Sequence, residues 1–397
     1  MKTFIQKNYV WILFLLLVSA GSFSAELINS RMDMRDLEVY YRAADRLTEG
    51  GELYRAVEDN PWEHYVYKYA PPAAMLFIPF LPLGIPLSKI IYWILLSFIL
   101  GTVLYNLKRL LSPKTASNRR VATSLLLGII IVGTHFFREL HLGQVNLLLL
   151  GIYIFALCLL QKEKPMGFAA LIAVSIFIKP FGLIFLPLLI IMGRFRELLY
   201  FTGFTILMIL LPMLFYADSN TYFELYVSWY RELTTELGAK QDLFSAGNHT
   251  IFSILARYSP LGLLPIEGSG RHIFQLGVML SLALLLLWFY FRRPVPERAL
   301  RLYIVLIAII PLLAFTSYNA FIFTLPLIIY LLFRFGELNI LFKIILIISC
   351  VFIGGNIYDL AGKDLYNYLW SISIYSWGTI GLLLTLFAHW NKFASLK

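Results

Sequence analysis

Long apolar runs recur along almost the whole chain, and they constrain the fold more than any other feature. A membrane-spanning helix needs about 20 consecutive apolar residues, whereas a spanning β-strand is shorter and alternates apolar with polar residues. The runs in this chain are long and uniform, and only 14% of all residues are charged, compared with about 25% in a soluble domain. The sequence therefore predicts an all-α, polytopic integral membrane protein.

We expect about twelve transmembrane helices (roughly ten to thirteen), forming a single domain over residues 1–397. The range is wide because several runs are short for a full crossing, especially the two on either side of Lys179-Pro180. The predicted spans are residues 8–25, 86–106, 121–135, 145–160, 166–178, 180–193, 199–217, 274–291, 302–316, 319–333, 341–357 and 371–389.

The charged residues separate clearly between the two sides of this predicted membrane protein. The side that holds the N-terminus has 19 Lys and Arg residues and four Asp and Glu residues, and the other side has 14 and 19. Cytoplasmic loops carry the excess of Lys and Arg, so both termini are predicted to be cytoplasmic. We expect the membrane to be the inner (plasma) membrane of a bacterium. The net charge of +10 thus reflects orientation rather than nucleic-acid binding. The large extracytoplasmic loops are then about 26–85, 136–144, 218–273 and 358–370.

Two further features leave the architecture unchanged. The segment from Lys2 to Gly21 fits either a membrane anchor or a cleaved signal peptide, and the following loop lies on the same side in both cases. The only two cysteines, Cys158 and Cys350, lie inside apolar runs, which excludes a disulfide framework or a thiolate metal site.

The densest polar stretch, Met32–Pro72, lies in the first outer loop and indicates a functional site there. Within it, Asp36–Leu53 has helical character, and we expect a short amphipathic helix at the membrane surface that Gly50-Gly51 ends. Asp36 lies at or near its N-terminus, where a carboxylate is stabilised by the helix dipole. It is therefore either a helix cap or a catalytic carboxylate. The apolar stripe of this helix consists of Leu37, Tyr40, Tyr41, Ala44 and Leu47.

Polar side chains also occur at the edges of later apolar runs. Gln144 and Asn146 begin a span, so they either make helix–helix hydrogen bonds or face a wet cavity. Lys179 interrupts a long apolar run and either extends to the membrane interface or binds a lipid phosphate. The third outer loop is rich in aromatic residues, which form either an interface belt or a surface for a sugar or acyl chain: Tyr222, Tyr226, Trp229 and Tyr230.

An ordered set of short motifs resembles glycosyltransferase family 87. It begins with Asp36–Ala44, Gly50, Leu53-Tyr54 and Tyr69-Ala70-Pro71-Pro72, and covers about residues 30–330. The segment Thr316–Asn319 differs from many relatives because it has no histidine. The later motifs are Gly143-Gln144-Val145-Asn146, Lys179-Pro180-Phe181 and Gly247-Asn248-His249-Thr250, of which the last differs slightly from the usual family pattern.

This resemblance implies the C-type glycosyltransferase fold and a polyprenyl-phosphate sugar as donor. The sequence has no phosphate-binding glycine-rich loop, and Asp33 and Asp36 are too widely spaced for an Asp-x-Asp metal motif, so neither a cofactor nor a metal is indicated. We expect Asp36 to be the general base. The donor phosphate would be bound by Lys179, Arg257 and Arg138. The candidate substrate-binding residues are Tyr40, Tyr69, His141, Gln144, Asn146, Asn248 and His249.

The predicted function is transfer of a hexose, most simply mannose, to a lipid or glycan acceptor on the extracytoplasmic face, with inversion at the sugar. The alternatives are a transporter or flippase of lipid-linked sugars and a non-catalytic assembly factor. A transporter would have internal repeats or paired broken helices, and no convincing repeat is present. The expected partners are membrane lipid, the sugar donor and the acceptor, without nucleic acid.

The orientation can be tested by labelling single cysteines from the outside with a membrane-impermeant maleimide. Because the excess of Lys and Arg marks the cytoplasmic side, positions in loops 25–70 and 218–270 should react, and positions in 107–120 and 292–300 should not. Labelling of 107–120 from the outside would contradict the orientation and the placement of the site.

Overall fold

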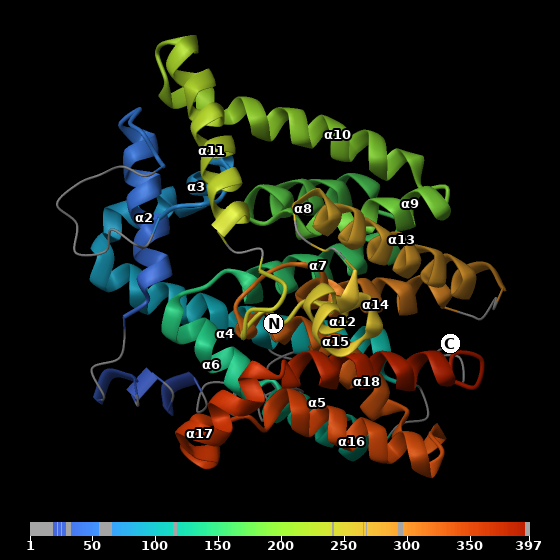
Figure 1. The fold of residues 1–397 in the computed structure, drawn as a ribbon. Helices are drawn as coiled ribbons and strands as arrows, with labels where there is room; N and C mark the ends of the chain where they lie inside the picture. The colour runs from blue at the N-terminus through green and yellow to red at the C-terminus, as the bar shows by residue number, and fades with distance from the viewer. Residues whose placement is uncertain are drawn as a thin grey trace. The chain divides into compact units, whose positions relative to one another are not determined.

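The computed structural model describes residues 19–21, 23–24, 26–28, 33–54, 66–113, 117–239, 242–264, 266, 268–292 and 297–393. Over these residues all regular structure is helical and no strand forms (Figure 1), so the all-α prediction is confirmed. Most of the first predicted span, 8–25, lies outside the described residues.

The chain forms two compact units, which are described separately. Unit 1 comprises residues 1–106 and 137–239, and unit 2 comprises residues 107–136 and 240–397. The single-domain organisation stays a prediction. The helices that lie wholly or mainly in unit 1 are α2 (Arg35–Thr48), α3 (Pro71–Ala74), η1 (Met75–Leu83), α4 (Gly84–Leu111), α6 (Gly133–Leu142), α7 (Asn146–Gln161), α8 (Pro165–Ile178), η2 (Pro180–Phe185), α9 (Leu186–Ile191), α10 (Phe195–Leu210), η3 (Leu211–Phe215) and α11 (Ser219–Ala239).

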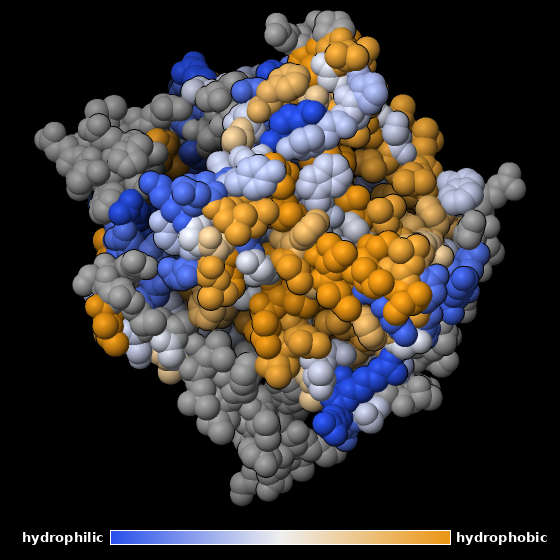
Figure 2. All heavy atoms as spheres, turned by 60° about the horizontal axis from the view of Figure 1, so that its bottom comes forward, coloured by the Kyte–Doolittle hydropathy of each residue, from blue (hydrophilic) through white to orange (hydrophobic). Residues whose placement is uncertain are grey.

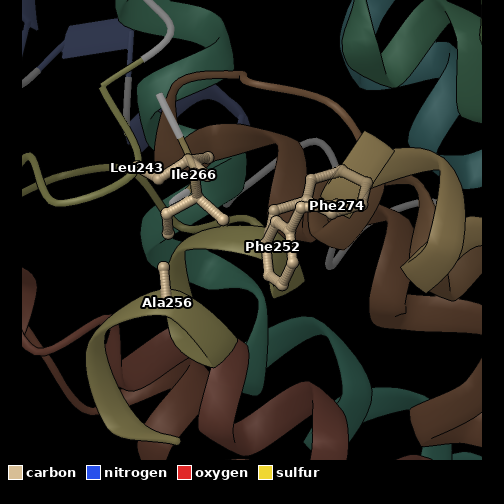
Figure 3. Close-up of a cluster of buried hydrophobic side chains, with 5 residues drawn as sticks. All are labelled: Leu243, Phe252, Ala256, Ile266 and Phe274. Atoms are coloured by element: carbon tan, nitrogen blue, oxygen red, sulfur yellow. The ribbon is translucent and has the colours of Figure 1, made fainter. Parts of the chain in front are cut away.

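Unit 2 is built around the pair α16 and α18, with α5 and α15 packed beside them (Figure 1). A second cluster joins α12 to α13, where the rings of Phe252 and Phe274 lie against Ile266 (Figure 3). The helices of unit 2 are α5 (Asn118–Ile131), α12 (Ile251–Tyr258), η4 (Pro260–Leu263), α13 (Gly268–Arg292), α14 (Arg298–Leu313), η5 (Tyr318–Thr324), α15 (Leu325–Phe333), η6 (Phe335–Glu337), α16 (Ile340–Gly354), α17 (Tyr358–Ser371) and α18 (Ile374–Ala388).

In unit 1, helices α7, α8 and α10 pack side by side (Figure 1). Their packing is apolar: Tyr153 of α7 and Phe168 of α8 are fully buried. Phe185 of η2 is also fully buried, and the centre of its ring lies 5.1 Å from that of Tyr153. The other faces of long helices in both units carry exposed apolar residues, including Leu199 of α10 and Leu280 of α13. Figure 2 shows a broad apolar area on one face of the molecule. Such exposed area is typical of a protein whose solvent is lipid.

From residue 86 onward the predicted apolar runs coincide with helices in the described part of the chain, but the number of spans is not confirmed. In the described part of the chain three helical segments are long and apolar enough to cross a membrane, or up to five if each of two bent pairs forms one span. The others are shorter; α7 has 16 residues, which is about 24 Å, compared with a hydrocarbon core of about 30 Å. The count of about twelve stays a prediction.

Two loop predictions are refined by the structure. The apolar segment 73–83, which was placed in the outer loop 26–85, is mostly the 3₁₀ helix η1, which contains Pro79 and Pro82 and leads directly into α4. The second outer loop, 136–144, is largely helical because α6 continues to Leu142. The site residues of that loop therefore lie on a helix and at its end.

The amphipathic helix predicted within Asp36–Leu53 forms as α2, which begins at Arg35 and ends before Leu53. Leu37, Tyr40, Ala44 and Leu47 are buried as predicted, whereas Tyr41 is half-buried. The helix ends at Thr48, after which Gly50 has φ 70°. The backbone N–H of Gly51 donates to Arg46 O at 2.8 Å, which is typical of a glycine-terminated helix.

Gly143 allows α2 to approach the link between α6 and α7. Its φ of 68° favours glycine, and a Cβ atom there would lie 2.9 Å from Leu37 Cβ. The replacement Gly143→Ala should therefore lower the melting temperature in detergent, because the left-handed backbone alone costs about 1 kcal/mol. In Gly203→Ala, where a Cβ would meet nothing within 4 Å, the melting temperature should not fall. Equal melting temperatures for both variants and the parent would contradict the close packing at Gly143.

Candidate active site

Four segments of unit 1 meet around Asp36, and backbone hydrogen bonds join them. Met34 N donates to His141 O at 3.1 Å, which links the start of α2 to the end of α6. Ala70 N donates to Phe177 O at 3.0 Å, which links the loop before α3 to the end of α8. Each bond pairs a group at a helix end, where backbone donors and acceptors lack intrahelical partners. The site is thus built from helix ends rather than from the middle of helices.

Asp36 lies in the first turn of α2, but it is not the cap of the helix. The N-cap residue is Met34, with φ 41° and no side-chain cap hydrogen bond. The Asp36 carboxylate instead accepts a short hydrogen bond from the Gln144 side chain. The neighbouring Asp33 forms an ion pair with Arg35 at 2.6 Å. A simple capping role therefore does not account for Asp36, whose side chain faces the other site residues.

The environment of Asp36 favours a carboxyl group of raised basicity. Burial raises the pKa of Asp36 above its usual value of 3.8, while the hydrogen bond from Gln144 and the charges of Lys179, Arg138 and Lys68 oppose this rise. Three cations near one half-buried carboxylate also provide positive charge for an anionic ligand. The arrangement combines a proton acceptor with a phosphate-compatible surrounding.

Two tyrosines complete the surroundings of the carboxylate. Tyr40 and Tyr69 have their hydroxyl oxygens 2.9 Å apart, and the Tyr40 hydroxyl also lies 3.5 Å from Gln144 Oε1. Burial raises the pKa of both phenols well above the usual range, so they remain neutral hydrogen-bonding groups. Tyr92 donates to the backbone oxygen of Gln144 at 3.1 Å. These contacts fix the Gln144 side chain that holds Asp36.

Lys179 is the single residue between α8 and η2, and it belongs to a series of hydrogen-bonded polar side chains. Its Nζ donates to Asn146 Oδ1 at 2.8 Å, and Asn146 Nδ2 donates to Glu139 Oε1 at 2.6 Å. The Nζ atom also lies 5.9 Å from the centre of the Tyr69 ring. Glu139 is fully buried and was not among the residues predicted from sequence. Its sequence signal was a carboxylate that follows the apolar pair Phe136-Phe137 and precedes Leu140.

Arg138 and His141 lie on the same helix, α6, with different contacts. The Arg138 Nε atom is buried and has no hydrogen-bond partner among the described residues. His141 Nδ1 lies 2.9 Å from a carboxylate oxygen of Glu26. The structure thus brings together seven predicted residues in unit 1: Asp36, Tyr40, Tyr69, Arg138, Gln144, Asn146 and Lys179.

The Gly247–Thr250 motif belongs to unit 2 and begins α12. Asn248 Oδ1 accepts hydrogen bonds from the Thr250 backbone and hydroxyl at 3.1 and 2.7 Å. The Thr250 side chain in turn caps α12 by accepting from Ser253 N. Gly247 has φ 88°, and a Cβ atom there would overlap the Trp370 ring. Much of this motif is therefore explained by local structure.

His249 and Arg257 lie in the same part of unit 2. His249 is buried among the rings of Phe321, Trp370 and Tyr375, and both of its ring nitrogens lack a hydrogen-bond partner among the described residues. Burial, and next the charge of Arg257, lowers the pKa of His249 to about 3. Arg257 donates to the backbone oxygens of Ser371 and Asn248. Their roles with the donor stay predictions.

The segment Thr316–Asn319 has no histidine of its own, but a histidine from another helix lies beside it. The ring of His135 lies 6.2 Å from the ring of Tyr318 and 5.2 Å from that of Tyr375. Its Nε2 atom lies 2.9 Å from the backbone oxygen of Ile353. An imidazole therefore lies beside this segment in unit 2, although it comes from α6.

Comparison with known proteins agrees with the motifs. The sequence model of glycosyltransferase family 87 matches residues 67–317, which is more than half of the chain, and the chain therefore belongs to this family. No curated protein and no solved structure matches it. The protein is thus a glycosyltransferase, and its apolar helices make it a membrane protein. This assignment favours the enzyme over the transporter and the assembly factor.

The pH dependence of turnover tests the role of Gln144. Asp36, the predicted general base, must be ionised to accept a proton, so its raised pKa should place the acidic fall of kcat/KM above the pH of about 4 that an ordinary aspartate would give. The Gln144 hydrogen bond opposes this rise. Gln144→Leu should therefore move the acidic fall to still higher pH. Gln161→Leu, at the exposed end of α7, should not move it; an equal shift in both variants would contradict the assignment.

Proposed function

We propose that this membrane glycosyltransferase transfers a hexose, with mannose as the first choice, from a polyprenyl-phosphate sugar to a lipid or glycan acceptor. The reaction takes place on the extracytoplasmic face and inverts the configuration of the sugar. The observation that carries this proposal is the half-buried Asp36 carboxylate, whose pKa is raised by burial and which lies near Lys179, Arg138 and Lys68. Membership in glycosyltransferase family 87 and the donor class implied by the resemblance support it.

In the proposed reaction Asp36 removes the proton from an acceptor hydroxyl. The hydroxyl oxygen attacks the anomeric carbon of the sugar, and the bond between that carbon and the phosphate oxygen breaks. The polyprenyl phosphate leaves with the bonding electron pair, and Lys179 and Arg138 stabilise its increased negative charge. Direct displacement from the opposite face inverts the anomeric centre.

The step needs few protein groups because the donor already carries its leaving group. Among the described residues no group of three or more His, Cys, Asp and Glu side chains is arranged to hold a metal ion. Arg138 and Lys179 lie close enough to Asp36 to influence its ionisation. They therefore supply the positive charge that a departing phosphate requires, and we assign this role to them.

The replacement Asp36→Asn tests the base directly. Asparagine keeps the size of the side chain and can still accept a hydrogen bond from Gln144, but it does not accept the acceptor's proton. With radiolabelled polyprenyl-phosphate mannose and native membrane lipid, the parent should form a glycosylated product. Turnover of the folded variant should fall by about 10²–10⁴-fold, while polyprenyl phosphate still binds.

The matched control is Asp33→Asn, because Asp33 is close in sequence but pairs with Arg35. It should retain turnover near that of the parent. An equal loss in both variants would indicate a general effect of charge in this loop. Full activity of Asp36→Asn would remove the proposed base, and a parent that forms no product would argue against the mannosyl donor.

A further inference from the structure

Glu139 is a fully buried carboxylate next to the candidate active site that the proposed reaction does not yet use. It lies on α6, and both of its carboxylate oxygens accept hydrogen bonds from the start of α7. Oε1 accepts from Asn146 Nδ2 at 2.6 Å, and Oε2 accepts from the backbone N–H of Leu147 at 3.0 Å. A buried carboxylate is costly unless it is paired, so its position requires an explanation.

One part of the explanation is structural. The N-cap residue of α7, Val145, has no side-chain cap hydrogen bond, and Glu139 binds an N–H group in the first turn instead. A negative charge at a helix N-terminus is stabilising. Capping explains the bond to Leu147, but it does not explain why the second oxygen binds the Asn146 side chain.

That second bond determines the orientation of the Asn146 amide. A carboxylate only accepts hydrogen bonds and an ammonium only donates them. The NH₂ group of Asn146 must therefore face Glu139, and its oxygen must face Lys179, as the distances of 2.6 and 2.8 Å indicate. Glu139 thus acts on Lys179 through one rigid amide.

The negative charge of Glu139 also helps to keep Lys179 protonated. Burial lowers the pKa of the Lys179 ammonium, and the carboxylates of Glu139 and then Asp36 oppose this decrease. The Lys179 side chain is long and flexible, and fixing it has an entropic cost of up to about 2 kcal/mol. A lysine that binds phosphate must be both charged and held in place.

We propose that Glu139 is a positioning residue that, through Asn146, holds Lys179 as an ammonium directed at the phosphate of the lipid donor. This inference rests on the proposed function, in which Lys179 binds that phosphate. Lys179 uses one of its three donors on Asn146, so two remain for phosphate oxygens. The rings of Tyr69 and Phe181 lie 5.9 and 5.7 Å from Nζ and restrict its movement.

The experiment measures binding of polyprenyl phosphate, which carries no sugar and needs no base, to purified protein from pH 7 to pH 11. The second ionisation of a phosphate monoester occurs near pH 6, below this range. Lys68 also acts on Asp36 and loses its charge at alkaline pH, so the part of the alkaline loss that is absent from Lys179→Met reports Lys179. Glu139→Gln should weaken binding about 10-fold at pH 7. It should also move the alkaline loss about one pH unit lower, because an adjacent anion has been removed.

A second variant separates this role from simple capping. In Glu139→Gln with Asn146→Asp, a carboxylate oxygen takes the place of the amide oxygen beside Lys179 Nζ. The double variant should regain affinity and return the alkaline loss at least to the parent's pH. Capping alone predicts no such rescue. Because the double variant retains one buried carboxylate beside Lys179, it also tests the proposal if the single variant does not fold.

Glu38→Gln is the matched control, because it removes a carboxylate paired with Lys89 at 2.5 Å elsewhere in unit 1, and it should bind like the parent. Lys179→Met distinguishes the two proposals. If Lys179→Met binds polyprenyl phosphate as the parent does, the phosphate role in the proposed function is wrong. Two outcomes would overturn only the role of Glu139 while Lys179→Met binds weakly. In one, Glu139→Gln keeps the parent's affinity and loses it at the same alkaline pH. In the other, the double variant loses affinity at a lower pH than the parent.

Discussion

The hydrogen bond between the Gln144 side chain and the Asp36 carboxylate is the contact on which the candidate site depends. It joins α2 to the link between α6 and α7, two segments that are far apart in the sequence. The bond requires the close approach that Gly143 permits and the fixed backbone oxygen that Tyr92 binds. Without these supports a carboxylate at this depth would lack a partner, and burial of an unpaired charge is unfavourable.

The same requirement explains why the site lies where helices end. Non-helical backbone at membrane depth is tolerated only where its polar groups are paired within the protein or line a cavity. Here the ends are paired with one another: Met34 with His141, and Ala70 with Phe177. The break at Lys179 places an ammonium, rather than an apolar side chain, beside the ends of α7 and α8. The interruptions in the apolar sequence are therefore what brings polar chemistry into an apolar protein.

Much of this arrangement was predictable from sequence because the signals are local. Hydrophobic periodicity identified α2 and its buried face, and the apolar runs coincide with helices from α4 to α18. Motif order selected Asp36, Gln144 and Lys179, which the structure brings together. The number of spans stays a prediction, because apolar composition does not show how strongly consecutive helices are bent, as α16 and α17 are by 96°.

Glu139 was missed for a physical reason. The sequence around it was interpreted as a polar outer loop, in which neighbouring charges would all be solvated. The segment is instead the helix α6, so Arg138 and Glu139 point in different directions, and Glu139 is fully buried while Arg138 is half-buried. Only the helical geometry, together with the position of α7, distinguishes the two.

The family assignment and the choice of base have separate foundations. The match to glycosyltransferase family 87 begins at residue 67, so it includes Gln144 and Lys179 but not Asp36 or the rest of α2. Asp36 is connected to the matched region by contacts: its carboxylate binds Gln144 and lies near Lys179 and Arg138. A helix outside the family match thus contributes the carboxylate that residues inside the match hold and polarise. We therefore regard α2 as part of the catalytic unit and not as a separate surface element.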